Sequence, residues 1–293
     1  MIHVLQNDVL RLKVSTAGAE MQSIENLATG FEYLWHGDPK FWRRRSPVLF
    51  PIVGSVAGGS FTVDGVTYPM GQHGFARDME FEPVDTEADD ELWYRLESTP
   101  ETLEKYPRRF RLEVGYRLVG ERITVMWRVT NLDGREMHFQ IGAHPAFMIP
   151  GFNPADTVRG YLAIDNPAPV TEIIETGGCV GPRTRQLQLD SDGMLPLEAS
   201  TFADDALIIG ASSVRRVSLL DRDRRPVLTL LFHTPYVGLW APAPDAPFVC
   251  IEPWYGRADS VGFTGEFRDR HAVNTLAPGA TFTASYLIAI DNA

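Results

Sequence analysis

The segment FRLEVGYRLVGERITVMWRVTN, residues 110–131, has the clearest structural pattern in the chain. Apolar and polar residues alternate on both sides of a central Gly-Glu pair. Because successive side chains of a β-strand point to opposite faces, this alternation predicts two strands that each bury one face. The segment therefore predicts an antiparallel hairpin. Its apolar positions are Phe110, Leu112, Val114, Tyr116 and Leu118 before the turn and Ile123, Val125, Trp127 and Val129 after it.

Similar alternation recurs along the chain, with few helical signals between the strands. Asp64-Gly65 is a strong hairpin signal, because both residues tolerate positive φ, and only STPETLEKYP, residues 98–107, resembles a capped helix. Strands with almost no helix must pack sheet on sheet. We therefore predict one all-β domain over residues 1–293, folded as a large two-sheet β-sandwich. Further predicted strands lie in SFTVDGVTYPM (60–70), VRRVSLLDRDRRPVLTLLFH (214–233), FVCIEPWYG (248–256) and TFTASYLIAI (281–290).

Composition excludes several classes of function. The chain has 293 residues and a formal net charge of −11, so its field repels phosphate backbones and disfavours nucleic acid as a partner. Its two cysteines, Cys179 and Cys250, form no CxxC or Cys/His pattern, so we expect neither a disulfide framework nor a structural zinc site. No run approaches the ~18 apolar residues of a membrane span, and the N-terminus does not resemble a signal peptide. We expect a cytoplasmic protein without a membrane partner.

The usual nucleotide, zinc-protease and serine-hydrolase motifs are absent from the sequence, which leaves polar residues near strand ends as candidates. In HFQIGAH, residues 138–144, alternation places His138, Gln140, Gly142 and His144 on one face. Gly142 should leave room above that face for something to approach. His144 is therefore either a proton-transfer group or a structural polar residue at a strand end.

A second candidate is Glu252 in FVCIEPWYG, which lies beside Trp254 and Tyr255. Pro253 cannot donate to a ladder, so we expect the strand to end near it. A carboxylate at such an end serves as a general base or is a surface residue. The sequence alone favours the surface interpretation.

Two loop segments hold further candidates. QHGFARD, residues 72–78, is either a binding loop or a turn in which Arg77 pairs with a neighbouring acid such as Asp78 or Glu80. FADDALII places Asp204 and Asp205 before an apolar run, where turn or cap acids are common. The remaining histidines lack such surroundings and are expected to be structural: His3, His36, His233 and His271.

Five short motifs occur in a fixed order between residues 46 and 259: SPVLFPIVG, HGFARD, HPAF, DALI and EPWYGRAD. Together they resemble the aldose 1-epimerase (galactose mutarotase-like) family. The resemblance covers most of the chain and implies a large two-sheet sandwich with a sugar bound in an open cleft. It implies no metal and no cofactor, a small-molecule sugar (an aldohexose or its phosphate) as partner, and a monomer or homodimer.

Matched motif by motif, the resemblance implies that His144 is the general acid and Glu252 the general base. It implies that His73 is a second histidine of the site, that Asp205 holds sugar hydroxyls, and that Arg77 lines the same cleft. Trp254 or Trp240 would offer a stacking face. Such sequences often carry a sugar-contacting arginine after FPIVG, where this chain has Ser55, so that contact is either lost or supplied by another residue such as Arg45 or Arg77.

The expected activity is interconversion of the α and β anomers of a hexose by acid–base ring opening and closure. One rival is a hexose-6-phosphate 1-epimerase, whose basic pocket would come from Arg43–Arg45 and Arg77. Another is a non-catalytic carbohydrate-binding protein, since similar sandwiches serve that purpose. A glycoside hydrolase is disfavoured, because Asp205 and Glu252 would have to flank the scissile bond and His144 would have no role.

Overall fold

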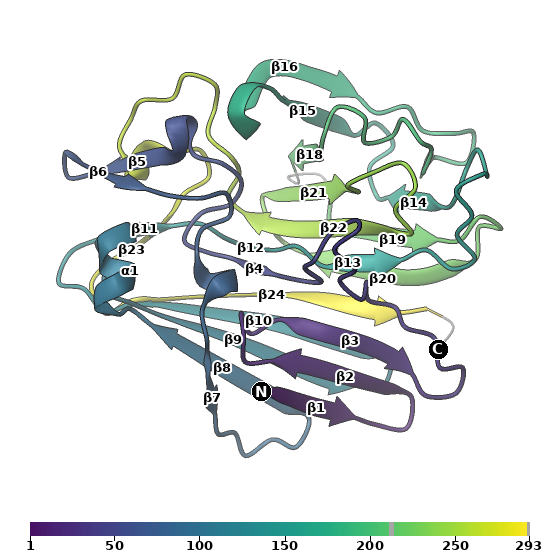
Figure 1. Ribbon diagram of the computed structural model, residues 1–293, viewed down its shortest axis with the longest axis horizontal. Helices are drawn as coiled ribbons and strands as arrows, with labels where there is room; N and C mark the ends of the chain where they lie inside the picture. The colour runs from purple at the N-terminus through teal and green to yellow at the C-terminus, as the bar shows by residue number, and fades with distance from the viewer. Residues whose placement is uncertain (211–213, 292–293) are drawn as a thin grey trace.

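The computed structural model describes residues 1–210 and 214–291 of the chain. They form strands joined by turns, one short α-helix and a few 3₁₀ turns (Figure 1). In chain order the elements are β1 (Ile2–Gln6), β2 (Leu10–Ser15), β3 (Met21–Asn26), β4 (Val48–Leu49), η1 (Ala57–Gly59), β5 (Ser60–Val63), β6 (Val66–Pro69), η2 (Ala76–Asp78), β7 (Glu82–Val84), β8 (Glu91–Glu97), α1 (Pro100–Lys105), β9 (Phe110–Val119), β10 (Arg122–Asn131), β11 (Met137–Phe139), β12 (Ile141–Ala143), β13 (Ala146–Met148), β14 (Tyr161–Ile164), β15 (Val170–Ile174), η3 (Thr176–Gly178), β16 (Val180–Gln186), β17 (Met194–Pro196), β18 (Leu207–Gly210), β19 (Arg216–Leu220), β20 (Pro226–Phe232), β21 (Tyr236–Trp240), β22 (Phe248–Tyr255), η4 (Phe267–Asp269), β23 (Asn274–Leu276) and β24 (Thr281–Ile290).

Two large antiparallel sheets form the sandwich. One has nine strands in the order β17-β14-β19-β20-β24-β10-β9-β8-β7. The other has eight, in the order β16-β15-β18-β21-β22-β12-β4 with β13 also paired to β22. In Figure 1, β24 of the nine-stranded sheet runs beneath the eight-stranded sheet. The predicted all-β, two-sheet sandwich is confirmed.

The hairpin predicted from residues 110–131 forms β9 and β10, paired from Phe110 opposite Asn131 to Val119 opposite Arg122. A separate three-stranded sheet, β1-β2-β3, lies against this region, and the Tyr116 hydroxyl donates to the Ala19 carbonyl at 2.6 Å. The predicted helix is α1, whose N-terminal amides are capped by Thr99.

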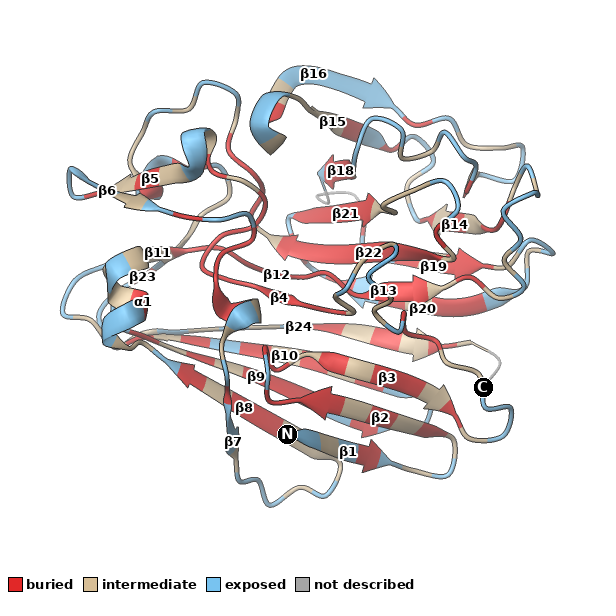
Figure 2. Ribbon diagram, viewed as in Figure 1, coloured by how far each residue is buried: buried red, intermediate tan, exposed pale blue. Residues whose placement is uncertain are grey.

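Alternation along β22 determines what each face of the eight-stranded sheet contacts. Val249 and Ile251 belong to the main hydrophobic core between the sheets. Cys250, Glu252 and Trp254 point to the opposite face and are also buried, as the continuous red of β22 shows (Figure 2). That outer face carries a cavity.

β22 ends at Tyr255, near Pro253 as expected, although Pro253 itself lies within the strand. The Ile251 N–H donates toward Pro145, so Pro253, two residues later, faces the same neighbouring strand. On that side β22 pairs with β13 up to Cys250 and with β12 from Trp254 onward. Pro253 falls in the interruption between these two ladders, where its missing N–H costs no ladder hydrogen bond.

Cys179 and Cys250 are both buried free thiols. Within the described part of the chain, no helix has the length and apolarity needed to cross a membrane. The prediction of a single domain over residues 1–293 stays a prediction.

Candidate active site

A cavity of about 460 Å³ opens on the outer face of the eight-stranded sheet. All seven residues selected from the sequence line it. Ser55 and Arg45 are not among its lining residues, and the Arg45 guanidinium donates instead to the Gln22 carbonyl. The lining residues are Phe41, Trp42, Gly54, Gln72, His73, Arg77, His144, Ile174, Gly178, Asp205, Ala206, Ile208, Trp240, Pro242, Glu252, Trp254 and Ala258.

His144, between β12 and β13, lies opposite Glu252 on the neighbouring strand β22. Gly142 pairs with Trp254 and Ala146 pairs with Cys250, so counting two residues inward from either pair brings His144 opposite Glu252. Both side chains project from the same face, and Nε2 of His144 lies 3.2 Å from Oε2 of Glu252. The short separation thus follows from strand register, although 108 residues separate the two positions in sequence.

Burial shifts the pKa values of this pair in opposite directions. Glu252 is 1% exposed, and desolvation raises its pKa well above the usual value; the Trp254 side chain opposes this, and Asp205 adds to it. Desolvation lowers the pKa of His144 to about 3, with Arg77 and Arg44 acting in the same direction. Between the lowered pKa of His144 and the raised pKa of Glu252, the pair therefore holds one proton, on the carboxyl group.

The alternative arrangement, an imidazolium of His144 beside a carboxylate of Glu252, holds the same single proton. Placing that proton on His144 instead of Glu252 converts a carboxylic acid and an imidazole into a carboxylate base and an imidazolium acid. Nδ1 of His144 and Oε2 of Glu252 are buried without hydrogen-bond partners among the described residues. Such unsatisfied polar atoms are common where a ligand supplies the missing partner.

Two glycines create the space that Trp254 occupies. A Cβ at Gly142 would lie 2.7 Å from the indole Cδ1, and a Cβ at Gly238 would lie 2.5 Å from its Cζ2. The indole therefore lies across the sheet beside Glu252, and a side chain at either glycine would displace it. The room expected above Gly142 exists, but Trp254 fills it.

Loop geometry fixes the position of His73. His73 and Gly74 both have positive φ, and a Cβ at Gly74 would lie 2.2 Å from the Phe50 carbonyl oxygen. Only glycine allows this close approach. The Gly54 N–H donates to Nδ1 of His73 at 3.1 Å, which leaves the proton of the neutral ring on Nε2. Burial, and after it the charge of His144, lower the pKa of His73 well below its usual value, so the ring is neutral.

Arg77 contributes positive charge to the cavity. Burial lowers its pKa to about 10, so it stays charged at neutral pH, and it donates to the Gln72 carbonyl at 2.6 Å. Its nearest approach to Asp78 is 3.9 Å, whereas Arg44 holds Asp78 at 2.8 Å. The predicted pairing of Arg77 with a neighbouring acid is therefore loose. Arg77 lines the cavity and Arg45 does not, so of these two arginines only Arg77 is placed to supply the sugar contact expected at Ser55.

The two adjacent acids of FADDALII, Asp204 and Asp205, have different surroundings. Asp205 has φ 84°, accepts from the Ala206 N–H at 2.7 Å and lines the cavity. Asp204 instead pairs with Arg185 at 2.9 Å outside the cavity. Of the four histidines expected to be structural, none lines the cavity; His271, for example, lies 2.6 Å from the Tyr236 hydroxyl.

Tryptophans enclose His144. The ring of Trp42 lies over the imidazole, with centroids 4.6 Å apart and planes at 30°, while Trp240 meets it edge-on at 5.5 Å. Sequence reasoning missed Trp42, as it missed Phe41 and Gln72, because a turn such as DPKFWRRRSP has no periodicity that indicates which side chain points inward. The aromatic Phe-Trp pair in a polar turn was the only available signal.

A metal ion has one candidate site here. The donor atoms of His144, Cys250 and Glu252 all lie within 4.8 Å of one another. Metal binding requires thiolate and carboxylate ligands, but burial raises the pKa of both Cys250 and Glu252 well above their usual values. Burial therefore opposes the ionised form of these ligands, and the expectation of no metal stays a prediction.

Comparison with known proteins places this arrangement in a family. The chain is 30% identical to the chromosomal LacX protein of Lactococcus lactis subsp. lactis, over 98% of this chain and 99% of that one. A galactose mutarotase related enzyme from Lactobacillus acidophilus superposes with a TM-score of 0.91 at 29% identity, over 100% and 98% of the two chains. A galactose mutarotase-like protein from Lactobacillus casei gives 0.92 at 29% identity, over 99% and 100%.

The family model described as aldose 1-epimerase matches residues 1–285. This match covers every residue that lines the cavity and both large sheets except residues 286–290 at the end of β24. The chain therefore belongs to the aldose 1-epimerase family.

Proposed function

We propose that the protein is a cofactor-independent aldose 1-epimerase that interconverts the α and β anomers of a hexose. The observation that carries the proposal is the buried His144–Glu252 pair, 3.2 Å apart in a cavity large enough for a small ligand. Opposite pKa shifts leave this pair with one mobile proton. Mutarotation requires one group that accepts a proton and one that donates a proton at the same time.

In the proposed mechanism, Glu252 as carboxylate takes the proton of the anomeric hydroxyl while His144 as imidazolium protonates the ring oxygen. The ring opens to the aldehyde, rotation about the C1–C2 bond exposes the other carbonyl face, and the ring closes with the two roles reversed. Sugar hydroxyls entering the cavity supply hydrogen bonds that the dry carboxylate lacks, which favours the charged form of the pair. Each positioned group typically contributes ~10²–10⁴-fold.

The remaining lining residues are proposed to orient the sugar. His73 presents an Nε2–H donor, Arg77 presents a cation and Asp205 presents a carboxylate, so hydroxyls find both donors and acceptors. Trp240 and Trp254 provide flat apolar surfaces against the C–H faces of a pyranose.

Polarimetry on freshly dissolved α-glucose, α-galactose and their 6-phosphates, with and without EDTA, tests the proposal. We expect relaxation of the free sugars well above the spontaneous rate, unchanged by EDTA. Binding without acceleration would instead show a non-catalytic carbohydrate-binding protein. Faster turnover of the 6-phosphates would favour the hexose-6-phosphate epimerase. Arg77 is the only Arg or Lys among the described residues that line the cavity. The cavity therefore offers a phosphate dianion a single cationic side chain.

A further inference from the structure

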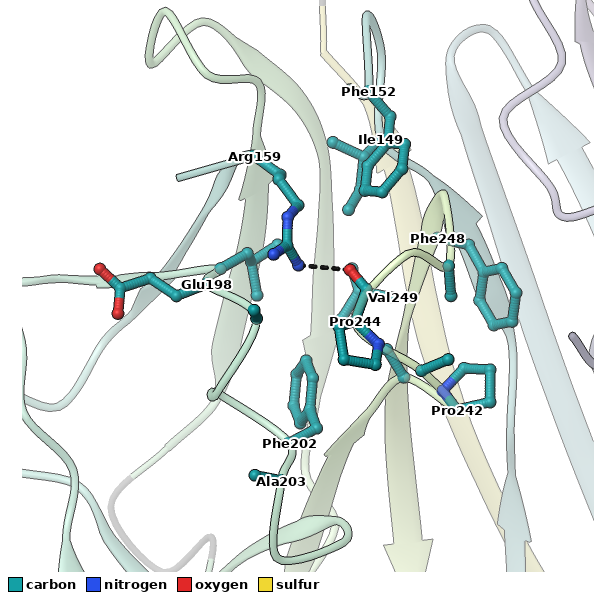
Figure 3. A pocket seen from close by; sticks show the side chains of 15 residues that line it. Ile149, Phe152, Arg159, Glu198, Phe202, Ala203, Pro242, Pro244, Phe248 and Val249 are labelled. Atoms are coloured by element: carbon teal, nitrogen blue, oxygen red, sulfur yellow. Dashed lines mark hydrogen bonds between the residues drawn. The ribbon is translucent and has the colours of Figure 1, made fainter. Parts of the chain in front are cut away.

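A second cavity, of about 300 Å³, lies at one end of the sandwich (Figure 3). Three segments wall it: residues 149–159 after β13, residues 197–203 after β17, and residues 241–249, which join β21 to β22 and include the start of β22. Pro242 lines both this cavity and the sugar cavity, so one loop separates them. None of the residues assigned to sugar chemistry above lines it.

Arg159 is the charged group inside this cavity. It is 8% exposed, its backbone N–H donates to Leu197, and its Nη1 donates to the Pro244 carbonyl at 2.5 Å. Its Nε is buried with no hydrogen-bond acceptor among the described residues, and no described carboxylate lies within 4.0 Å of the guanidinium. Figure 3 shows the guanidinium pointing into the cavity toward Pro244, while the carboxylate of Glu198 points away from it.

A buried guanidinium without a counter-ion is unfavourable, because the charge loses its hydration and gains no ionic partner. One carbonyl compensates only part of that loss. The free energy recovered by an anion is correspondingly large, since an arginine–carboxylate pair forms two charge-assisted hydrogen bonds in parallel. A cavity that holds the Arg159 guanidinium, with no described carboxylate within 4.0 Å of it, is therefore suited to an anionic ligand.

The rest of the lining indicates what the anion is attached to. Apart from Arg159 and Glu198, the lining side chains are apolar: Ile149, Phe152, Leu197, Ala199, Phe202, Ala203, Ala241, Pro242, Ala243, Pro244, Ala246, Phe248 and Val249. Sugar hydroxyls would find few partners here, and a phosphate dianion would find a single cation in a protein of net charge −11. A small apolar body with one carboxylate satisfies both parts of the pocket.

We propose that this cavity is a second ligand site that binds a small monocarboxylate whose body is one aromatic ring or a branched alkyl group, held by Arg159. The proposal is independent of the sugar chemistry, because it uses a different cavity and different residues. The probes are benzoate and 3-methylbutanoate, titrated calorimetrically into the whole protein, with benzamide and inorganic phosphate as comparison ligands. We expect benzoate to bind with Kd on the order of 0.1–1 mM, and benzamide and phosphate to bind at least ~10-fold more weakly.

Variants assign the binding to this cavity. Arg159→Gln should weaken benzoate binding at least ~10-fold, and Ala243→Phe, which fills the cavity while keeping the arginine, should do the same. The matched control is Arg77→Gln, which removes the buried arginine of the sugar cavity and should leave benzoate binding unchanged. If Arg159→Gln does not fold, Arg159→Lys and Ala243→Phe carry the test.

Three results would overturn the proposal. They are no binding of either carboxylate at 20-fold above the expected Kd, benzoate binding unaffected by the Arg159 and Ala243 substitutions, and phosphate binding more tightly than benzoate. In the first case Arg159 has only the structural role of holding the Pro244 carbonyl.

Discussion

At the residue scale, the proposed mechanism makes the pH range of activity depend on the single proton of the His144–Glu252 pair. Protonation of His144, whose pKa burial lowers to about 3, removes the proton acceptor at the acid end. Ionisation of Glu252 at its raised pKa removes the proton to be donated at the alkaline end. We therefore expect kcat/KM for mutarotation, which reports the free enzyme, to stay high through weakly acidic pH and to fall as pH rises through the pKa of Glu252.

Polarimetric initial rates over a pH series, corrected for the spontaneous reaction in each buffer, measure this profile. A pH dependence in the opposite direction would identify the other protonation state of Glu252. A rate that rises with pH through the ordinary pKa of a glutamate would mean that Glu252 is ionised in the free protein.

The same carboxyl group makes stability depend on pH. The unfolded chain ionises Glu252 at an ordinary carboxyl pKa, whereas the fold keeps it protonated to higher pH, so between the two pKa values the native state binds more protons and stability falls as pH rises. Glu252→Gln removes this penalty. We expect the stability of the variant relative to the parent to increase as pH rises above the ordinary carboxyl pKa, by about 1.4 kcal/mol for each unit by which burial raises the pKa of Glu252.

Urea denaturation of both proteins across that pH range measures the difference. Glu136→Gln is the matched control, because Glu136 also lies beside a histidine but is 59% exposed. It should show no such trend. If the Glu252→Gln variant instead lost stability relative to the parent as pH rises, the carboxyl group of Glu252 would not be buried in its protonated form.

Sequence reasoning reached the cavity residues that lie in motifs but not those in irregular turns. His144 and Glu252 could be assigned to strands, and alternation then gave their faces. Trp42 and Arg159 lie between strands, where the direction of a side chain depends on contacts made by distant loops, such as the one between Arg159 and Pro244. No local pattern encodes such contacts.

At the element scale, β21 and β22 position Trp254 beside Glu252 through the small size of Gly238. Gly238→Ala would place a Cβ 2.5 Å from the indole, which must then move. Because the neighbouring strands fix the backbone, we expect a loss of about 1–3 kcal/mol in stability and a fall in kcat of at least ~10-fold.

Gly210→Ala is the control for this substitution. Gly210 lies on β18 of the same sheet, and its Cβ would meet nothing nearer than a Tyr236 ring carbon at 3.9 Å. Its effect on stability should stay within about 0.5 kcal/mol. Thermal unfolding and polarimetry of both variants make the comparison; equal losses in the two would show that the Trp254 position is not the cause.

Local patterns predicted strands better than strand ends. Residues 110–131 formed the expected hairpin, because alternation and a two-residue turn are both local properties. The strand does end near Pro253, but Pro253 itself lies within it, because whether a proline interrupts a strand depends on which neighbour its missing N–H would face. The position of Pro253 faces the interruption between β12 and β13, and this interruption exists only in the assembled sheet.

At the scale of the whole molecule, net charge opposes anionic substrates. A charge of −11 repels a sugar phosphate over distances that low salt leaves unscreened, while Arg77 attracts it only inside the cavity. Raising ionic strength from ~0.01 to ~0.15 M shortens the Debye length from ~30 to ~8 Å. We therefore expect salt to raise kcat/KM for a hexose 6-phosphate relative to that for the free hexose.

The ratio of the two values of kcat/KM at low and at moderate salt measures this effect. A ratio that falls with salt would indicate a net attractive basic pocket, and would favour the phosphorylated substrate.

The central claim is that the His144–Glu252 pair performs the proton transfers, and the most direct test compares it with a similar pair elsewhere in the chain. His138 and Glu136 lie 3.1 Å apart outside the sugar cavity. Polarimetry on α-galactose and α-glucose, with each variant checked for folding, should show that His144→Asn and Glu252→Gln each lower kcat at least ~10²-fold, while His138→Asn and Glu136→Gln retain the parental rate. Full activity in either cavity variant would contradict the account.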